Sequence, residues 1–174
     1  KGVDLMKKVA ILLADGFEEI EALTPKDVLS RAGFICDLVS IKGNNVIRST
    51  HEVCILADKV ISDCGDFSEY DMIVLPGGMP GAKFLAESEK VIDIVRNFDK
   101  QGKYIGAICA APATVLSKAG IARGRKVTSY LGMDNYLSDS VYIPSSSSSG
   151  SSGCGGGCSS CGGGCSSCGG GGSW

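Results

Sequence analysis

The sequence predicts an α/β protein in which a mostly parallel sheet carries helices on both of its faces. Three short, mainly apolar runs, at residues 8–14, 70–75 and 104–108, are typical of strands that are buried on both faces of a sheet. Each run is followed by a segment in which apolar residues recur at helical spacing. Strands that alternate with helices in this way form parallel sheets covered by helices on both sides.

The chain is expected to begin with a strand, a helix and a second strand. The first strand covers residues 8–14, the helix residues 18–32 and the second strand residues 34–41. Acidic residues crowd the first turn of the helix, where the helix dipole favours negative charge, and Gly33 suits its C-terminal end. Because proline has no N–H group, Pro25 should kink this helix or divide it in two.

The stretch after the second strand is polar and irregular. Residues 42–52 contain a Gly-Asn-Asn turn signal, and the short apolar pieces 53–55 and 59–61 are expected to form an excursion at the edge of the sheet. A buried strand follows at residues 70–75. It ends in residues 76–81, a loop too rich in glycine and proline to be regular.

Three helices and three strands complete the predicted domain. Residues 83–101 are expected to form one long amphipathic helix that ends before Gly102. The strand at residues 104–108 leads into a helix over residues 111–119, whose first position suits Pro112. Beyond it we expect, in order, a fifth strand at residues 126–130, a short helix at 134–138 and a further strand at 141–143.

Length and charge limit the classes of protein to which the chain can belong. Its 174 residues suit one domain, and 17 basic against 19 acidic residues give a net charge of −2 without a basic stripe, so nucleic acid is not an expected partner. No apolar run reaches the roughly 18 residues of a membrane helix, and the N-terminus lacks a signal-peptide core. A cytoplasmic protein is therefore expected. Met6 resembles a natural start, so residues 1–5 are interpreted as a leader and residues 6–144 as the domain.

The nine cysteines fall into two groups. Cys36, Cys54, Cys64 and Cys109 are scattered without metal-ligand spacing and are expected to be reduced thiols. The other five lie in residues 145–174, a segment of serine, glycine and cysteine that has almost nothing to bury. Three interpretations stay open: a metal or disulfide cluster, a flexible linker or tag, and a stand-in for the domain's own C-terminal strand and helix. The third is preferred, and it predicts a strand, loop and helix packed on the core.

Cys109 is the strongest candidate for chemistry. Small residues flank it between the strand at residues 104–108 and Pro112, which suits the sharp strand-to-helix turn of a nucleophile elbow. At such a turn the sulfur faces the helix N-terminus, where free N–H groups and the dipole favour the thiolate. The alternative is an inert core thiol, because free cysteine is often buried.

Four loops are expected to meet near Cys109. Residues 16–21, Gly77-Gly78, Cys109 and Tyr130 each follow the end of a predicted strand. Because ligands of parallel sheets bind beyond the carboxyl ends of the strands, these loops should line one crevice.

Three segments of the chain stand in the order and spacing of a known family. They are Ala14-Asp15-Gly16-Phe17-Glu18-Glu19-Ile20-Glu21, Leu75-Pro76-Gly77-Gly78 and Ala107-Ile108-Cys109-Ala110-Ala111-Pro112. On these segments, residues 6–143 resemble the ThiJ/PfpI superfamily, in its deglycase and chaperone branch. The resemblance implies a flavodoxin-like (Rossmann-like) three-layer sandwich, a homodimer, and a reactive cysteine that needs no metal or nucleotide cofactor.

The resemblance also assigns roles to individual residues. Cys109 matches the nucleophile, and Glu21 matches a glutamate whose protonated carboxyl donates a hydrogen bond to the thiolate. Gly78 and Ala110 match the backbone amides of an oxyanion hole. The pocket is matched by three further residues, Glu18, Gly77 and Tyr130.

One departure from the family affects the chemistry. Some members hold a histidine beside the sulfur, where this chain has Ala110 and Tyr130, and its only histidine, His51, is distant in sequence. A cysteine protease or a glutamine amidotransferase therefore lacks its base. A neutral Glu21 would lower the pKa of Cys109, whereas an ionised Glu21 would raise it by charge repulsion. The blander alternatives are a solvated first-turn glutamate for Glu21 and a half-buried strand-end tyrosine for Tyr130.

Three functions follow from this arrangement as alternatives. In the first, Cys109 adds to the aldehyde of methylglyoxal or of its early adducts, Gly78 and Ala110 hold the oxyanion, and Glu21 moves the proton before water releases lactate. In the second, Cys109 is the oxidisable thiol of a redox sensor or chaperone that performs no turnover. In the third, the crevice binds a ligand without chemistry.

Overall fold

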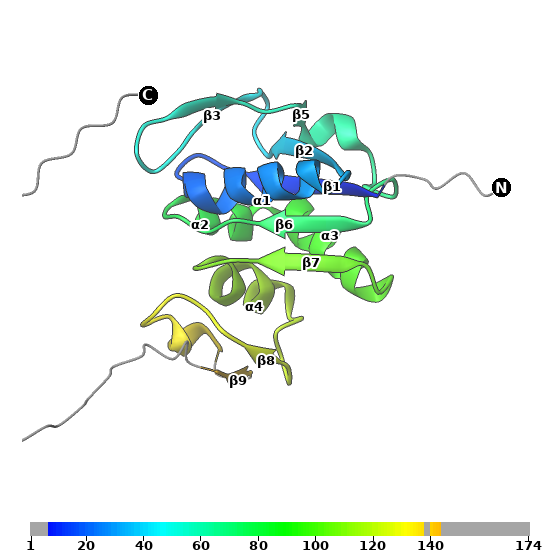
Figure 1. Cartoon of the computed structure of the whole chain (residues 1–174). Coiled ribbons are helices and arrows are strands. Elements are labelled where there is room, and N and C mark those ends of the chain that lie inside the picture. Colours follow the sequence, from blue (N-terminus) through cyan, green and yellow to red (C-terminus); the bar gives the residue numbers. More distant parts are fainter. Residues whose placement is uncertain (1–6, 138–139, 144–174) are drawn as a thin grey trace, which may run out of the picture.

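A parallel sheet of five strands forms the centre of the computed structural model, which describes residues 7–137 and 140–143 (Figure 1). The strand order is β5-β2-β1-β6-β7, and every neighbouring pair is parallel, as predicted. In the register of the sheet, Lys8 lies opposite Ile35 and Val9 opposite Met72. The strands are β1 (Lys8–Leu13), β2 (Ile35–Ser40), β5 (Lys59–Val60), β6 (Met72–Leu75) and β7 (Tyr104–Ala107).

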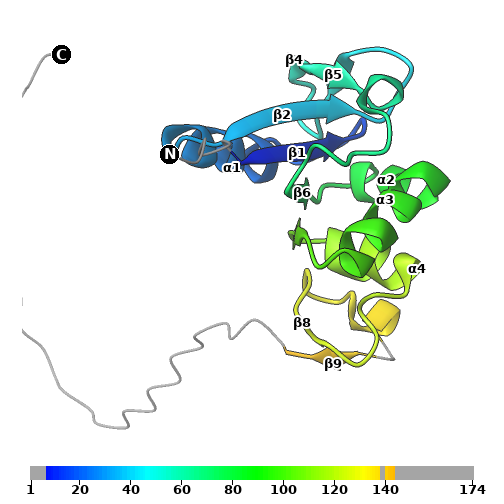
Figure 2. The same cartoon turned by 90° about the vertical axis from the view of Figure 1, so that its right-hand side faces the viewer.

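Helices cover both faces of the sheet, which confirms the three-layer α/β prediction (Figure 2). One face carries α1 (Glu19–Arg31), and the other carries α2 (Gly81–Glu87), α3 (Glu89–Lys100) and α4 (Ser117–Ala119). A π-helical segment, η2 (Pro112–Leu116), runs directly into α4, with proline at its start as expected.

The strand β1 explains why both faces must be covered. Its Ala10 and Leu12 belong to the core cluster that also contains the buried residues of α3, whereas Ile11 and Leu13 belong to the cluster beside α1. Successive side chains of a strand point to opposite faces of the sheet. An uninterrupted apolar strand can therefore be buried only between two layers of helices.

The helix α1 is continuous through Pro25. Pro25 lies inside it without dividing it, because the helix loses only the one hydrogen bond that a proline N–H cannot donate. Ala22 is the one buried residue of the helix, and Ile20 is 71% exposed. The outer face of α1 thus presents apolar side chains to solvent.

The segment predicted as one helix over residues 83–101 is two helices. The first, α2, ends at Glu87, and α3 begins at Glu89. Between them Ser88 has an extended backbone, and its hydroxyl accepts a hydrogen bond from the N–H of Val91. Serine is a strong N-cap, so this residue ends one helix and begins the next.

The structure also changes the prediction for the short strands. β3 (Val46–Arg48) lies inside the stretch predicted as a polar loop. It pairs with β4 (Cys54–Leu56), on the apolar piece expected at residues 53–55, as an antiparallel hairpin outside the central sheet. The expected fifth strand at residues 126–130 is confirmed only as β8 (Lys126–Val127), and it lies outside the central sheet. It pairs with β9 (Val141–Tyr142), which confirms the further strand predicted at residues 141–143. Residues that follow β8 bond instead to the turn at Cys109. The short helices are η1 (Ile61–Cys64) and η3 (Asp134–Leu137), both of the 3-10 type.

Two predictions can be judged only for part of the chain. Within the described residues, no helix is both long enough and apolar enough to cross a membrane. Cys36, Cys54, Cys64 and Cys109 are free thiols, as expected. The leader at residues 1–5 and the Ser/Gly/Cys segment at residues 145–174 lie outside the described residues, so their interpretations stay predictions.

Candidate active site

Cys109 sits on the sharp turn that its sequence predicts, between β7 and η2. Its φ angle is +55°, in the left-handed region that residues other than glycine rarely adopt. The carbonyl oxygen of Cys109 accepts hydrogen bonds from the Ser129 hydroxyl and from the Tyr130 N–H, both at 2.8 Å. Backbone strain of this kind costs about 1–3 kcal/mol and persists only where surrounding contacts hold it, which is typical of active sites.

Glu21 brings the first turn of α1 to the sulfur. Its carboxyl oxygen Oε2 accepts the N–H of Gly77 at 2.7 Å, which fixes the side chain toward the loop after β6. The carboxyl group is also hydrogen-bonded to the Cys109 thiol. Three segments that are distant in sequence therefore meet around one sulfur atom, at the carboxyl ends of the strands, as the crevice prediction requires.

Two glycines allow the loop after β6 to approach this closely. A Cβ atom on Gly77 would lie 2.7 Å from the Cβ of Cys109 and 2.7 Å from Oε2 of Glu21. Gly78 has a φ of +86°, and a Cβ atom there would lie 2.5 Å from the backbone nitrogen of Glu18. Any other residue at these positions would push the loops apart, and with them the groups around the sulfur.

Opposing influences act on the thiol of Cys109. Burial raises the pKa of Cys109, and the negative charge of Glu21 and its hydrogen bond raise it further. The backbone N–H groups of Gly78 and Ala110 hydrogen-bond to the sulfur and act in the opposite direction, without reversing the shift. The thiolate of Cys109 is therefore disfavoured beside the charge of Glu21.

Glu18 and Tyr130 contribute to this site through their backbone. The N–H of Glu18 donates to the carbonyl of Gly77 at 3.1 Å, and the N–H of Tyr130 holds the carbonyl of Cys109. The Tyr130 side chain is 61% exposed, and within the described part of the chain its hydroxyl makes no hydrogen bond. A role for the phenol in the pocket stays a prediction.

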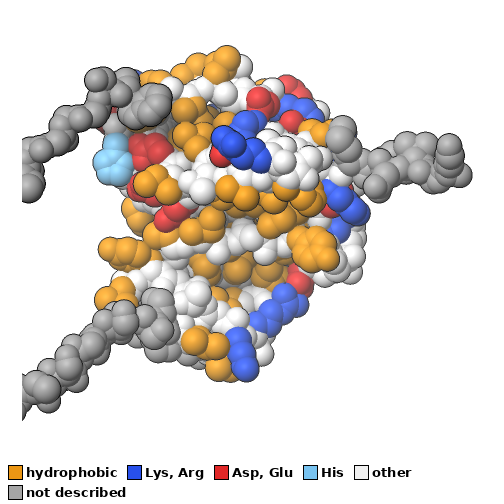
Figure 3. Space-filling model, viewed as in Figure 1, with side chains coloured by type: hydrophobic (Ala, Val, Ile, Leu, Met, Phe, Trp, Pro, Cys, Tyr) orange, Lys and Arg blue, Asp and Glu red, His pale blue; other side chains and the backbone are white. Residues whose placement is uncertain are grey.

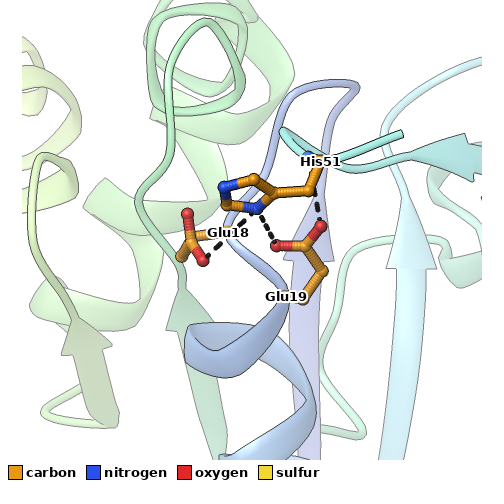
Figure 4. Close-up of side chains that lie close together, drawn as sticks. All are labelled: Glu18, Glu19 and His51. Carbon is orange, nitrogen blue, oxygen red and sulfur yellow. Dashed lines mark hydrogen bonds and ion pairs between the residues drawn. The ribbon is translucent and has the colours of Figure 1, made fainter. Parts of the chain in front are cut away.

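Two residues near the site are not identified from the sequence. Ser129 is buried and hydrogen-bonds to the backbone of the elbow, and its place directly before Tyr130 was the only available signal. His51 lies against the first turn of α1, with Nδ1 2.9 Å from Oε2 of Glu19 and 3.9 Å from Oε1 of Glu18 (Figure 4). No sequence pattern joins His51 to these residues, because the contact links α1 to the loop after β3.

The contact between Glu19 and His51 shifts the pKa values of the two side chains in opposite directions. Hydrogen bonds from the Ser49 hydroxyl and from His51 lower the pKa of Glu19 to about 2. The hydrogen bond to Glu19 and the charges of Glu19 and Glu18 raise the pKa of His51. The one histidine ring of the chain is thus hydrogen-bonded to Glu19 rather than to Cys109, in keeping with the missing base of a cysteine protease.

A polar cavity of about 500 Å³ lies beside this site but does not include Cys109. Its charged groups already pair with one another, Lys42 with Asp15 at 2.6 Å and Arg48 with Glu52. The candidate active site is therefore identified by the groups around the Cys109 sulfur and not by this cavity.

The sequence profile of the DJ-1/PfpI family matches residues 7–149. The chain belongs to the DJ-1/PfpI family. Within it, protein dj-1beta of Drosophila melanogaster is 38% identical over 133 residues, which cover 76% of this chain and 70% of the fly protein. The crystal structure of Drosophila melanogaster DJ-1beta matches with a TM-score of 0.76 at 36% identity, over 81% of this chain and 75% of that structure.

Two further DJ-1/PfpI relatives bear on function. A deglycase of Pyrococcus abyssi is 33% identical over 126 residues, which cover 72% of this chain and 74% of the deglycase. The structure of oxidised Toxoplasma gondii DJ-1 matches with a TM-score of 0.70 at 37% identity, over 75% of this chain and 70% of that structure. Some relatives are much longer than this chain. In DJ-1 homolog B of Arabidopsis thaliana, the matched region covers only 31% of that protein.

Membership of the DJ-1/PfpI family confirms the resemblance carried by the three sequence motifs. It also agrees with the observed α/β fold. Relatives of this kind include both DJ-1 proteins and a deglycase. The reaction of this chain is therefore a separate question, which the site must help to answer.

Proposed function

We propose that this DJ-1/PfpI protein hydrolyses methylglyoxal, or the early adducts of methylglyoxal on amines and thiols, without glutathione or a cofactor. The observation that carries the proposal is the hydrogen bonding of one sulfur, Cys109, to Glu21 and to the N–H groups of Gly78 and Ala110. The deglycase among its relatives supports the same class of glycated or carbonyl substrate. The free thiols suit a reducing compartment such as the cytoplasm.

The proposed reaction begins with the thiolate of Cys109. The sulfur adds to the aldehyde carbon of methylglyoxal, a C–S bond forms, and the carbonyl oxygen becomes an alkoxide. The N–H groups of Gly78 and Ala110, which contact the sulfur at rest, hold this oxyanion. Glu21 then gives its proton to the alkoxide, and the product is a hemithioacetal.

Glu21 next acts as a base. Its carboxylate takes the proton from the former aldehyde carbon and passes it to the ketone oxygen, which gives an enediol. Glu21 then takes the hydroxyl proton from the former aldehyde carbon and delivers it to the neighbouring carbon, which gives a lactoyl thioester and leaves Glu21 as a carboxylate. Water adds to the thioester, the C–S bond breaks and lactate leaves. In sum, methylglyoxal and water give lactate and one proton, and the thiolate and the protonated Glu21 are regenerated.

The hydrogen bond from Gly77 suits Glu21 to this role. Because Oε2 of Glu21 accepts the Gly77 N–H, the proton of a neutral Glu21 is best carried by the other oxygen, Oε1. One carboxyl oxygen is then held in place while the other moves the proton. A fixed acceptor of this kind keeps the acid oriented through both proton transfers.

Lactate formation from methylglyoxal in the absence of glutathione tests the proposal. Cys109→Ala should abolish it, whereas Cys54→Ala, which removes an exposed thiol on β4, should keep it. Circular dichroism confirms that both variants are folded. Equal lactate from Cys109→Ala and the unmodified chain would exclude Cys109 as the nucleophile.

A redox sensor is the second candidate, favoured by the match to an oxidised DJ-1 structure. Peroxide would oxidise the Cys109 thiolate to the sulfenate and be reduced to water or an alcohol, and a second peroxide would give the sulfinate. A protonated Glu21 would then donate its hydrogen bond to the sulfinate oxygen. Selective oxidation of Cys109 before Cys54, measured by mass spectrometry, together with no lactate formation, would favour this function over hydrolysis.

We also propose that the outer face of α1 pairs with a second copy of the chain. Ile20, Leu23 and Val28 are exposed there, and apolar side chains gather over this side of the molecule (Figure 3). Burial of such side chains against a second copy would remove apolar surface from water. Sedimentation should show a dimer that Ile20→Glu weakens and Tyr104→Ser, an exposed aromatic on the edge of the sheet, does not.

A further inference from the structure

Three side chains with metal-ligand atoms converge at the start of α1, outside the group of residues around Cys109. They are Glu18, Glu19 and His51, and one ligand atom from each lies within 4.8 Å of the others. Figure 4 shows the two carboxyl groups reaching the same ring nitrogen of His51 from either side. The residues come from two elements, the first turn of α1 and the loop after β3, so the fold rather than the local sequence assembles them.

The spacing of these atoms suits a small cation. Zinc lies about 2.0–2.2 Å from an imidazole nitrogen or a carboxylate oxygen, so two ligand atoms of a tetrahedral site are about 3.3 Å apart. The observed distances from Nδ1 of His51 are 2.9 Å to Glu19 and 3.9 Å to Glu18, on either side of that value. Shifts of about half an ångström, chiefly of the exposed His51 ring, would complete the set.

The charges at this place are not balanced. The side chains of Glu18 and Glu19 are only 28% and 15% exposed, yet no lysine or arginine among the described residues lies within ion-pair distance of either carboxylate. Their one counter-charge is the His51 ring, so two carboxylates share at most one positive charge. Partly buried carboxylates normally have a full partner, because water stabilises them less than at an open surface.

A supporting contact already orients one of the ligands. The buried Ser49 hydroxyl and the backbone N–H of His51 both donate to Oε1 of Glu19, and this leaves Oε2 to the ring. Outer hydrogen bonds that fix a ligating carboxylate are a regular part of metal sites. The positive end of the α1 dipole opposes a cation here, but it amounts to only about half an elementary charge against two carboxylates.

We infer that Glu18, Glu19 and His51 form a binding site for a divalent cation of the zinc class. Nδ1 of His51 and one oxygen of each carboxylate are the three protein ligands, and water completes the coordination. The cation replaces the proton that Nδ1 otherwise shares with the carboxylates. No sequence pattern points to a metal at this place, since His51 is distant from Glu18 and Glu19 along the chain. The inference is independent of the chemistry at Cys109.

The single histidine of the chain makes a direct test simple. Proton NMR follows the two ring C–H signals of His51 in the full chain at about pH 8, where the ring competes least with protons, while Zn²⁺ is added from a chelator-buffered series. Buffering the free Zn²⁺ keeps thiols elsewhere in the chain from changing the midpoint. We expect the ring signals to move to saturation, and Glu18→Gln to raise the midpoint by at least about tenfold.

Glu89→Gln is the matched control, because Glu89 lies in the first turn of α3, away from the cluster, and should leave the midpoint unchanged. Ring signals that do not move at any Zn²⁺ concentration would show that the cluster is only an ion pair. An unchanged midpoint in Glu18→Gln would show that zinc binds His51 without this site. Either result overturns the inference, and both can be read whether or not the protein forms lactate.

Discussion

Two glutamates on the same turn of α1 have opposite surroundings. Glu19 receives hydrogen bonds from Ser49 and His51, and they lower the pKa of Glu19 to about 2. Glu21 faces Gly77 and a thiol that can itself become an anion. Donors alone stabilise a charged carboxylate, whereas a neighbouring anion favours the protonated acid. In the proposed mechanism Glu19 keeps its charge, while Glu21, two residues away, transfers a proton.

The difference depends on which loop each carboxylate reaches. Glu19 turns toward the loop after β3, and Glu21 turns toward the loop after β6 and the elbow. The helix therefore links the candidate active site to the proposed cation site. Substitutions that act on only one of the two carboxylates are the best way to test whether they are as different as the geometry indicates.

The largest effect is expected for Glu21→Gln. Glutamine keeps the size and the hydrogen bond from Gly77 and can donate to the sulfur, but it cannot carry a proton between atoms. Turnover should fall by about 10²–10⁴-fold, while the rate at which iodoacetamide labels Cys109 at neutral pH stays within about threefold.

The same variant, Glu21→Gln, tests whether Glu21 is protonated in the free protein. If Glu21 were ionised in the free protein, its charge would be holding the pKa of Cys109 up, and Glu21→Gln would speed labelling of Cys109 by tenfold or more (about one pKa unit). That result would contradict a protonated Glu21. Glu19 and Glu21 would then both be ionised in the free protein.

An intermediate effect is expected for Gly77→Ala. The added Cβ would meet Cys109 and Glu21 at 2.7 Å, so the site must open and the fold should lose about 1–3 kcal/mol of stability in urea unfolding. Gly43→Ala is the control, since nothing lies within 4 Å of a Cβ there, and it should change stability by less than about 0.5 kcal/mol. Equal stabilities for the two variants would show that the close approach is not needed.

The smallest effect is expected for Glu19→Gln, and it falls on His51. The hydrogen bond to Glu19 raises the pKa of His51, so the ion pair persists as pH rises until His51 loses its proton, and it is lost at low pH only when Glu19 is protonated near pH 2. Glu19→Gln should lower the pKa of His51 toward its ordinary value, measured by the ring C–H shifts with a chelator present. Glu21→Gln should leave the His51 titration unchanged. If both variants shift it equally, the two carboxylates are not separate.

Much of the fold could be predicted because its signals are local. Apolar runs identify the strands that are buried on both faces, and the small residues before Pro112 identify the turn at Cys109. The β3–β4 hairpin was missed because Val46–Arg48 is a three-residue strand in a polar stretch. The exposure of Ile20 could not be predicted, because periodicity shows an apolar stripe without showing what covers it.

The site was harder to predict because its contacts are long-range. Glu21 and Gly77 are 56 residues apart, and His51 and Glu19 are 32 apart. The pairing of Glu21 with Cys109 came from the family resemblance, since a glutamate in a first helical turn is ordinarily solvated. No such pattern pointed to His51, whose place follows from the path of the loop after β3.

Two of the three groups that act on the sulfur belong to the main chain, at Gly78 and Ala110. Short of proline, no substitution deletes a peptide N–H, so the donor at Ala110 survives substitutions that would destroy a side-chain site, whereas Gly78 must also stay glycine because of its close approach to Glu18. A complete substitution scan would accordingly highlight Cys109 and Glu21 and pass over Ala110. Replacing the amide at Ala110 by an ester through chemical ligation is the way to expose what that nitrogen does.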